Sequence, residues 1–183
     1  MGVLVVFGGE IHHARCARKT DTTSLTAFSS PQTGPLGRVT EGHATIWSRV
    51  PRSLNLDPAV LDRRVLVVPT MAGDDGSLAR AALATDPDGI VIGTLGAGHL
   101  HPQLLRLWAE ASERIPVVAY CRPERGVVLT STYGYPGSEQ ELRESRIIPA
   151  AFLSPQAARM KLLACLASGL SIEETRDAFR QDD

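Results

Sequence analysis

The sequence lacks paired cysteines, a long apolar run and a surplus of charge of either sign. Its 183 residues include only three cysteines, Cys16, Cys121 and Cys165, which lie far apart and match no CxxC spacing. Three cysteines cannot all pair within one chain, so a disulfide scaffold is excluded as the main source of stability. We expect free thiols that pack as small apolar side chains in a reducing compartment.

Two classes of partner are disfavoured by what is missing. With 19 basic and 20 acidic residues the formal net charge is −1, so no basic field is available to bind nucleic acid. The apolar run at the start, Val3–Phe7, is too short for a membrane span or a signal peptide, and no basic segment precedes it. We therefore expect no nucleic-acid partner and no membrane partner, and a location in the cytoplasm.

The first elements that the sequence does contain are strands. The apolar, β-branched run Val3–Phe7 is followed by a glycine pair and predicts a strand buried on both faces. Arg38–Thr40 and Ala44–Trp47 flank a glycine turn and predict a short hairpin. One strand and one hairpin cannot bury such a run by themselves. Residues 1–47 are therefore interpreted as the remnant of a larger domain, and the sequence as one that has lost its beginning.

The pattern changes after residues 48–61, which contain two prolines and no run of strand formers and are interpreted as a linker. Residues 62–183 alternate strand-like runs with helical patterns, which indicates βαβ crossovers around a parallel sheet and thus an α/β domain. The predicted strands are Arg64–Val68, Gly89–Ile92, Val117–Tyr120 and Val127–Leu129, and the predicted helices span 74–84, 102–114, 155–167 and 172 onward.

A glycine-rich turn, Gly93–Gly98, follows one predicted strand and precedes a helix, which is where α/β folds bind ligands. Its GxxGxG spacing differs from the GxGxxG of dinucleotide-binding folds, and Cys121 stands where the next strand should end in an acid. Close backbone packing explains the glycines equally well. Nucleotide binding is the weakest alternative that we carry forward.

A second candidate is the polar loop Lys19–Gly37, which is rich in threonine and serine. A lysine beside an acid and hydroxyls can activate a nucleophile or stabilise a developing charge. The same composition also suits a solvated loop whose side chains bond to nearby backbone. No metal site is expected, because His99 and His101 have no carboxylate close in sequence and no HExxH pattern occurs.

Taken together, these segments resemble the bacterial-type L-asparaginases, a family of asparaginase/glutaminase amidohydrolases. The resemblance covers essentially the whole chain in order, and its most specific part is the lysine motif followed by SPxxGPLG. The segments that carry it are KTDTT at 19–23, SPQTGPLG at 30–37, DGIV at 88–91, GAGHL at 96–100, TYGYPGSE at 132–139 and LSPQAAR at 153–159.

The resemblance implies a fold of two α/β domains. Residues 1–47 would be the tail of a flavodoxin-like N-terminal domain, and residues 62–183 would be the smaller C-terminal asparaginase domain with its parallel sheet. It also implies a homo-oligomer whose sites are built across an intimate dimer, or pairing with a complementary chain. No cofactor is implied.

The activity implied by the resemblance is hydrolysis of L-asparagine, or of L-glutamine, by attack of a threonine hydroxyl on the side-chain amide. Lys19 matches the family's catalytic lysine. His99 stands where the family has an asparagine, and Glu139 best matches a glutamate. Both would bind near the substrate's α-amino group in the neighbouring subunit's site. Because the loop aligns loosely, Glu141 remains an alternative to Glu139.

The two threonine segments of the family, TGGT and HGTDT, do not occur in the 183 residues. Groups that act as a unit lose nearly all of their rate enhancement when one member is missing. We therefore expect the chain to be inactive alone. The alternative is a non-catalytic partner subunit that completes an active site in trans.

Overall fold

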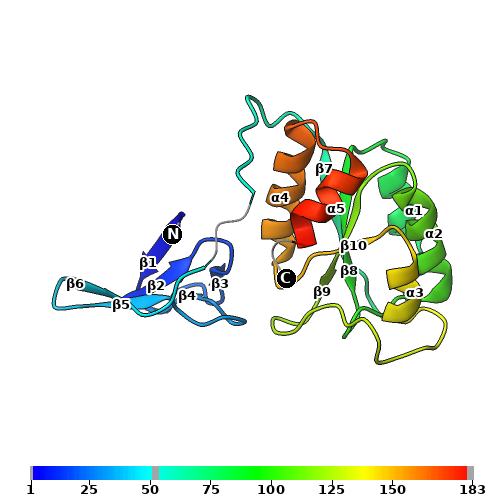
Figure 1. The fold of residues 1–183 in the computed structure, drawn as a ribbon. Coiled ribbons are helices and arrows are strands. Elements are labelled where there is room, and N and C mark those ends of the chain that lie inside the picture. The colour runs from blue at the N-terminus through cyan, green and yellow to red at the C-terminus, as the bar shows by residue number, and fades with distance from the viewer. Residues whose placement is uncertain (1, 51–53, 181–183) are drawn as a thin grey trace. The chain divides into compact units, whose positions relative to one another are not determined.

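The computed structural model describes residues 2–50 and 54–180 and divides the chain into two compact units, Met1–Ser53 and Leu54–Asp183 (Figure 1). Each unit has its own sheet. The strands of the first unit are β1 (Leu4–Phe7), β2 (Glu10–His13), β3 (Arg18–Lys19), β4 (Phe28–Ser29), β5 (Gly37–Thr40) and β6 (His43–Ile46).

The N-terminal unit is built on an antiparallel sheet in the order β1-β2-β5-β6. The predicted hairpin is confirmed as β5–β6, and its turn residues Glu41 and Gly42 have φ values of 49° and 78°. Gly8 and Gly9 make a second two-residue turn, with φ values of 57° and 79°, and return the chain as β2. Positive φ at both central positions matches the right-handed twist of a hairpin, which explains both glycine turns.

The prediction that Val3–Phe7 is a strand buried on both faces is wrong. The run does form β1, but Val6 is 57% exposed and Phe7 is 38% exposed. The reason is the position of β1 at the edge of a single antiparallel layer, since the described residues of the N-terminal unit form no helix that could cover the second face. The run of apolar residues predicted the strand correctly, but the number of packed layers sets its burial.

The C-terminal unit contains a parallel sheet in the order β10-β9-β8-β7. This confirms the α/β class with a parallel sheet predicted for the second part of the chain. Its strands are β7 (Val65–Val68), β8 (Gly89–Thr94), β9 (Val117–Cys121) and β10 (Ile148–Pro149), and its helices are α1 (Ser77–Leu83), α2 (Pro102–Ser112), α3 (Glu139–Glu144), α4 (Pro155–Ala167) and α5 (Ile172–Arg180).

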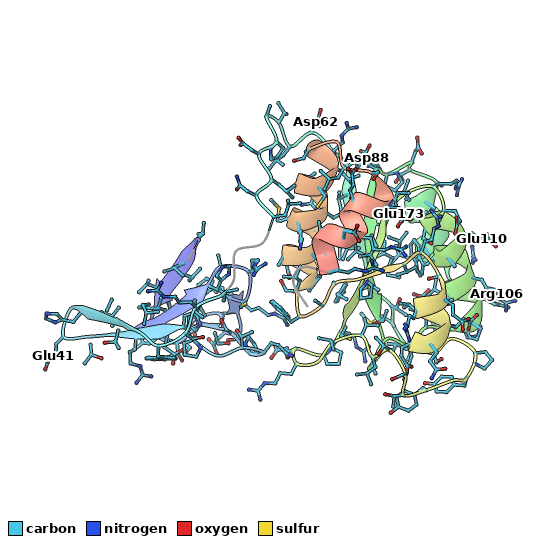
Figure 2. The ribbon with its side chains drawn as sticks, viewed as in Figure 1. Glu41, Asp62, Asp88, Arg106, Glu110 and Glu173 are labelled. Atoms are coloured by element: carbon cyan, nitrogen blue, oxygen red, sulfur yellow. The ribbon has the colours of Figure 1, made fainter. Side chains whose placement is uncertain are left out.

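Helices cover both faces of this sheet. The helices α1, α2 and α3 lie on one side, and α4 and α5 lie on the other (Figure 1). Ile90 and Ile92 pack toward Trp108 of α2, whereas Val91 packs toward Leu162 of α4. Every residue of β8 is buried for this reason, because alternate side chains of a central parallel strand face two apolar layers. Charged side chains such as Arg106 and Glu110 point outward from α2 (Figure 2).

The fourth strand differs from the prediction. Val127–Leu129 form no strand, and Ile148–Pro149 pair with β9 instead. The side chain of Val128 is buried in the core of the first face, and the Leu129 amide donates to the Ala97 carbonyl. These residues therefore pack over the glycine turn that follows β8, and their apolar character reflects that contact.

Two helix starts follow the predicted capping chemistry. Ser154 accepts a hydrogen bond from the Ala157 amide at 3.1 Å at the start of α4. Ser171 and Glu174 form a reciprocal capping box before α5, with the Glu174 carboxylate 2.8 Å from the Ser171 amide. The two capped helices pack on the sheet face opposite to α1, α2 and α3. No helix among the described residues has the length and apolar character needed to cross a bilayer.

Candidate functional site

The candidate site of the C-terminal unit begins in the turn that follows β8. Leu95 and His99 exchange backbone hydrogen bonds of 2.9 Å across it. Gly98 has a φ of 118°, and a Cβ there would lie 2.8 Å from Val128 Cγ1 and 3.1 Å from Glu139 Cβ. Only a residue without a side chain lets the turn approach the loop before α3 this closely. The glycine therefore serves close packing, and this packing brings His99 to Glu139.

Glu139 is the buried acid of the site. Its side chain is fully buried at the first position of α3, and Oε1 accepts the amides of Thr132 at 2.8 Å and Tyr133 at 2.6 Å. Burial raises the pKa of the carboxyl, but the amides of Tyr133, Glu139 and Thr132, together with the His99 ring, outweigh it and hold the pKa below its usual value. The group is therefore a carboxylate at neutral pH.

His99 lies between this carboxylate and two tyrosines. Its Nε2 is 3.4 Å from Glu139 Oε2, and its Nδ1 is 2.8 Å from the Tyr135 hydroxyl. The ionised Glu139 favours a proton on Nε2, so Nδ1 accepts the Tyr135 proton. The ring also meets Tyr133 and Tyr135 edge to face, with centroid distances of 4.9 Å and 5.2 Å. Tyr135, His99 and Glu139 thus form a chain from the surface to a buried negative charge.

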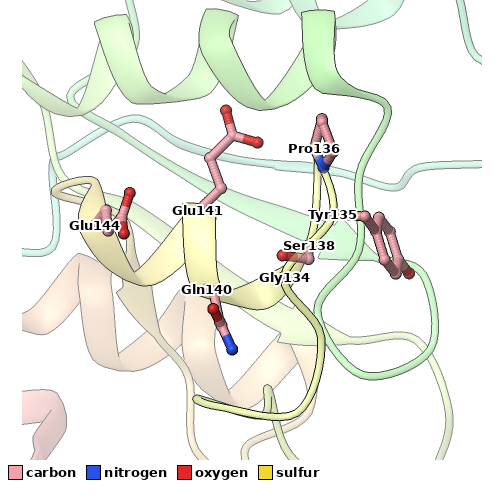
Figure 3. A pocket seen from close by; sticks show the side chains of 7 residues that line it. All are labelled: Gly134, Tyr135, Pro136, Ser138, Gln140, Glu141 and Glu144. Carbon is pink, nitrogen blue, oxygen red and sulfur yellow. The ribbon is translucent and has the colours of Figure 1, made fainter.

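The alternative carboxylate, Glu141, lies elsewhere on α3. Its Oε2 accepts the Gly137 amide at 2.6 Å, and its side chain lines a shallow hollow of about 300 Å³ together with Gln140 and Glu144. Figure 3 shows the side chains that line this hollow, with Glu141 and Glu144 on α3 and the ring of Tyr135 pointing away from them. The geometry therefore pairs His99 with Glu139 and leaves Glu141 with the loop backbone.

Lys19 belongs to the N-terminal unit, where it forms part of the two-stranded ribbon β3–β4. It is exposed, and its Nζ lies 5.9 Å from the centre of the Phe28 ring, the residue directly opposite in the ribbon. Asp21 Oδ1 accepts the amides of Thr23 and Ser24, each at 2.8 Å, and these bonds hold the pKa of Asp21 below its usual value. The carboxylate and hydroxyl groups of the loop therefore form hydrogen bonds with nearby residues. These bonds shape the segment that carries Lys19.

Sequence reasoning missed the tyrosines as members of the site and also the buried histidine of the N-terminal unit. His12 of β2 is fully buried, with Nδ1 3.0 Å from Ser30 Oγ and Nε2 3.4 Å from Glu10 Oε2. The alternation of Glu10 and His12 along one strand face would have suggested their contact, but Ser30 lies 18 residues away. Within the described part of the chain, no three His, Cys, Asp or Glu side chains gather in a way that could hold a metal ion.

Comparison with known proteins relates both units to one family. A family model for the glutaminase/asparaginase C-terminal domain matches residues 64–179, and a model for the N-terminal asparaginase domain matches residues 1–52. The chain is 39% identical over 184 residues to a protein named "Probable L-asparaginase" from Deinococcus radiodurans, an alignment that covers 98% of this chain and 56% of the relative. It is 30% identical over 171 residues to an L-asparaginase of Bacillus licheniformis, covering 91% of this chain and 52% of the relative.

A solved structure has a similar fold. The crystal structure of a probable cytoplasmic L-asparaginase from Campylobacter jejuni aligns with a TM-score of 0.82 at 27% identity, over 98% of this chain and 57% of that chain. The chain thus spans about half the length of the relatives that it matches, at 52% to 57%.

Proposed function

Because the chain belongs to the glutaminase/asparaginase family, we propose that it forms part of an amidohydrolase that converts L-asparagine and water to L-aspartate and ammonia. The observation that carries the proposal is the match to this family in both units, together with the lysine loop in one and the buried carboxylate in the other. L-Glutamine is the second substrate of the proposal. The cytoplasm is the proposed location, supported by the name of the Campylobacter jejuni protein.

The proposed reaction needs a threonine hydroxyl, which attacks the side-chain amide carbon. The C–N bond breaks, ammonia leaves with the added proton, and an ester forms between the threonine and the aspartyl group. Water then hydrolyses this ester and releases aspartate. Lys19 supports the attack as a fixed positive charge and proton carrier. The residues of the chain include neither TGGT nor HGTDT, so the threonines come from another polypeptide segment.

His99 and Glu139 are proposed to act in the site of a neighbouring subunit, near the α-ammonium group of the substrate. The charge of Glu139 suits this role, since an ionised buried carboxylate attracts a cation. A homo-oligomer or a pair with a complementary chain would bring the two halves together. Residues 1–47 and 62–183 are the proposed parts of the two family domains, joined by residues 48–61.

A second candidate function is a partner subunit that has no catalytic turnover of its own. This function uses only His99 and Glu139 of the 183 residues and needs neither TGGT nor HGTDT in the same chain. Such a chain would lend His99 and Glu139 to the site of another polypeptide. The two candidates differ in the role of Lys19, which reacts in the first and is irrelevant in the second.

Ammonia release from L-asparagine tests both candidates. The purified chain alone is expected to release none. Mixing it with a polypeptide that carries the TGGT and HGTDT segments, taken from the N-terminal part of the 39% identical relative, is expected to produce activity. Lys19→Ala should then lower kcat about a thousandfold, because it removes one member of a catalytic unit.

Lys19→Arg is the matched variant, since it keeps the charge but cannot give up its proton. Activity that survives Lys19→Ala in the mixture would support the partner-subunit function. Ammonia release by the chain alone, abolished by Lys19→Ala, would contradict the proposed need for a second polypeptide. If both polypeptides are folded and their mixture releases no ammonia, the amidohydrolase proposal is contradicted.

A further inference from the structure

The order of exposure in the site decides which groups a ligand can touch. Glu139 is fully buried and the His99 side chain is 22% exposed, whereas Tyr133 and Tyr135 are 43% and 49% exposed. A group that arrives from solvent therefore meets the phenols before it meets the acid. The charge of Glu139 attracts a cation, but its oxygens lie beneath His99 and are closed to direct contact.

Both nitrogens of His99 are already directed at other groups. Nε2 faces Glu139 Oε2 at 3.4 Å, and Nδ1 receives the Tyr135 hydroxyl at 2.8 Å. Because the Tyr135 hydroxyl donates its hydrogen bond to His99, the lone pairs of its oxygen can accept a further hydrogen bond. The outermost acceptor of this group is thus the Tyr135 oxygen, which is 49% exposed as a residue and bonded to His99 Nδ1.

The surrounding rings add a second attraction for positive charge. Tyr133 and Tyr135 lie 5.9 Å apart between ring centroids, and both meet His99 edge to face. Aromatic faces attract ammonium groups within about 6 Å through the ring quadrupole. An N–H of an ammonium group can therefore bond to the phenol oxygen while the cation rests beside the rings.

We propose that Tyr135 is the residue that binds the ligand's ammonium group directly, and that His99 and Glu139 act through it. His99 is a positioning residue that holds the phenol proton, and Glu139 supplies the charge. The identity of the ligand as an amino acid rests on the proposed function. The direct contact with the Tyr135 hydroxyl is argued from the distances that join Tyr135, His99 and Glu139.

The test uses the intact 183-residue chain and methylammonium chloride, followed by NMR chemical shifts of the tyrosine and His99 rings. Wild-type protein is expected to show saturable shifts at these residues. Tyr135→Phe should weaken methylammonium binding about tenfold, as expected for a lost hydrogen bond to a charged group. Tetramethylammonium has no N–H, so its binding should change little in the same variant.

Glu144→Gln is the matched control, because it removes an exposed negative charge from α3 and leaves Tyr135, His99 and Glu139 in place. Its methylammonium affinity should stay within about twofold of wild type, well below the loss of one hydrogen bond. The ¹⁵N shifts of His99 report the positioning role, since Tyr135→Phe should leave Nδ1 without its donor. An unchanged methylammonium affinity in Tyr135→Phe, or the absence of shifts in wild-type protein, would overturn the proposal.

This experiment separates the inference from the proposed function. Methylammonium binding that depends on Tyr135, with no ammonia release in the complemented assay, would leave the inference standing and contradict the amidohydrolase. Complemented activity whose KM for L-asparagine is the same in Tyr135→Phe would contradict the inference and leave the amidohydrolase standing.

Discussion

Glu139 illustrates how single side chains of this protein acquire their chemistry. A fully buried carboxyl would ordinarily bind a proton, since burial disfavours its charge. Two amides on one oxygen and a histidine beside the other reverse that outcome and keep it ionised. The same carboxylate therefore holds the loop before α3 in place and provides the negative charge of the site.

The lowered pKa of Glu139 predicts a pH dependence of stability. A carboxyl whose folded pKa lies below its usual value of 4.5 stabilises the fold above that pH, and this stabilisation is lost as the pH falls through the folded pKa. In thermal melts from pH 7 to pH 3, the midpoint of wild type should fall more steeply below pH 4.5 than that of Glu139→Gln.

Glu144→Gln is the control for this comparison, because it removes an exposed carboxylate from the same helix and changes the net charge equally. Its melting profile should follow that of wild type. Parallel profiles for wild type and Glu139→Gln would show that the carboxylate contributes nothing to acid stability.

At the scale of secondary-structure elements, the geometry of the candidate site depends more on the turn after β8 than on strand β8 itself. The strand β8 is held by two parallel neighbours and two apolar layers. The turn packs closely at Gly98, where an added Cβ would lie 2.8 Å from Val128 Cγ1 and 3.1 Å from Glu139 Cβ. A substitution in this turn should therefore alter the candidate site without displacing the strands of the sheet.

Gly98→Ala and Gly96→Ala test this view as a pair. Both glycines have positive φ, at 118° and 49°, but a Cβ on Gly96 would have no described atom within 4 Å. Gly96→Ala should cost about 1 kcal/mol of unfolding free energy from backbone strain. Gly98→Ala should cost a further 1–3 kcal/mol, roughly the cost of overpacking. Urea denaturation measures both.

The two variants should also differ in the site. The ring signals of His99 and Tyr135 are expected to shift in Gly98→Ala, because its Cβ would press on Glu139, and to stay in place in Gly96→Ala. Equal stability loss in both variants, with unchanged His99 signals, would mean that the close approach at Gly98 does not position the acid.

At the scale of the whole molecule, the two units differ in how completely their sheets are covered. The parallel sheet has apolar layers on both faces. The N-terminal unit leaves large apolar side chains exposed, among them Val6 and Phe7 of β1 and the neighbouring Val3 and Trp47. Strand β1 is also an edge strand, and an apolar edge strand is a surface on which another chain can pair.

We therefore predict that the chain self-associates through β1. Val6→Thr should weaken the association about tenfold, since removing one exposed valine from an interface loses roughly 1.5 kcal/mol of burial. Sedimentation velocity over a range of protein concentrations measures the change. Leu25→Thr, which alters an exposed apolar residue in the loop between β3 and β4, should leave the association unchanged. A wild-type chain that stays monomeric throughout would contradict the prediction.

The sequence by itself determined the elements that depend on neighbouring residues. The parallel α/β pattern, the β5–β6 hairpin and the caps at Ser154 and Ser171 were all predictable. Their causes lie within a few residues of each other: alternating apolar runs, positive-φ glycines and side chains that reach an amide three positions on. The family motifs are likewise a property of residue order.

Tertiary structure alone decided which distant residues meet. Ile148–Pro149 replaced Val127–Leu129 as the fourth strand, and β1 was left exposed, because strand partners and covering layers are non-local. The contact of His99 with Tyr135 joins positions 36 residues apart and exists only because a glycine turn and a loop pack closely. The number of residues between two positions does not predict such a contact, because its geometry is set by the packing of the whole unit.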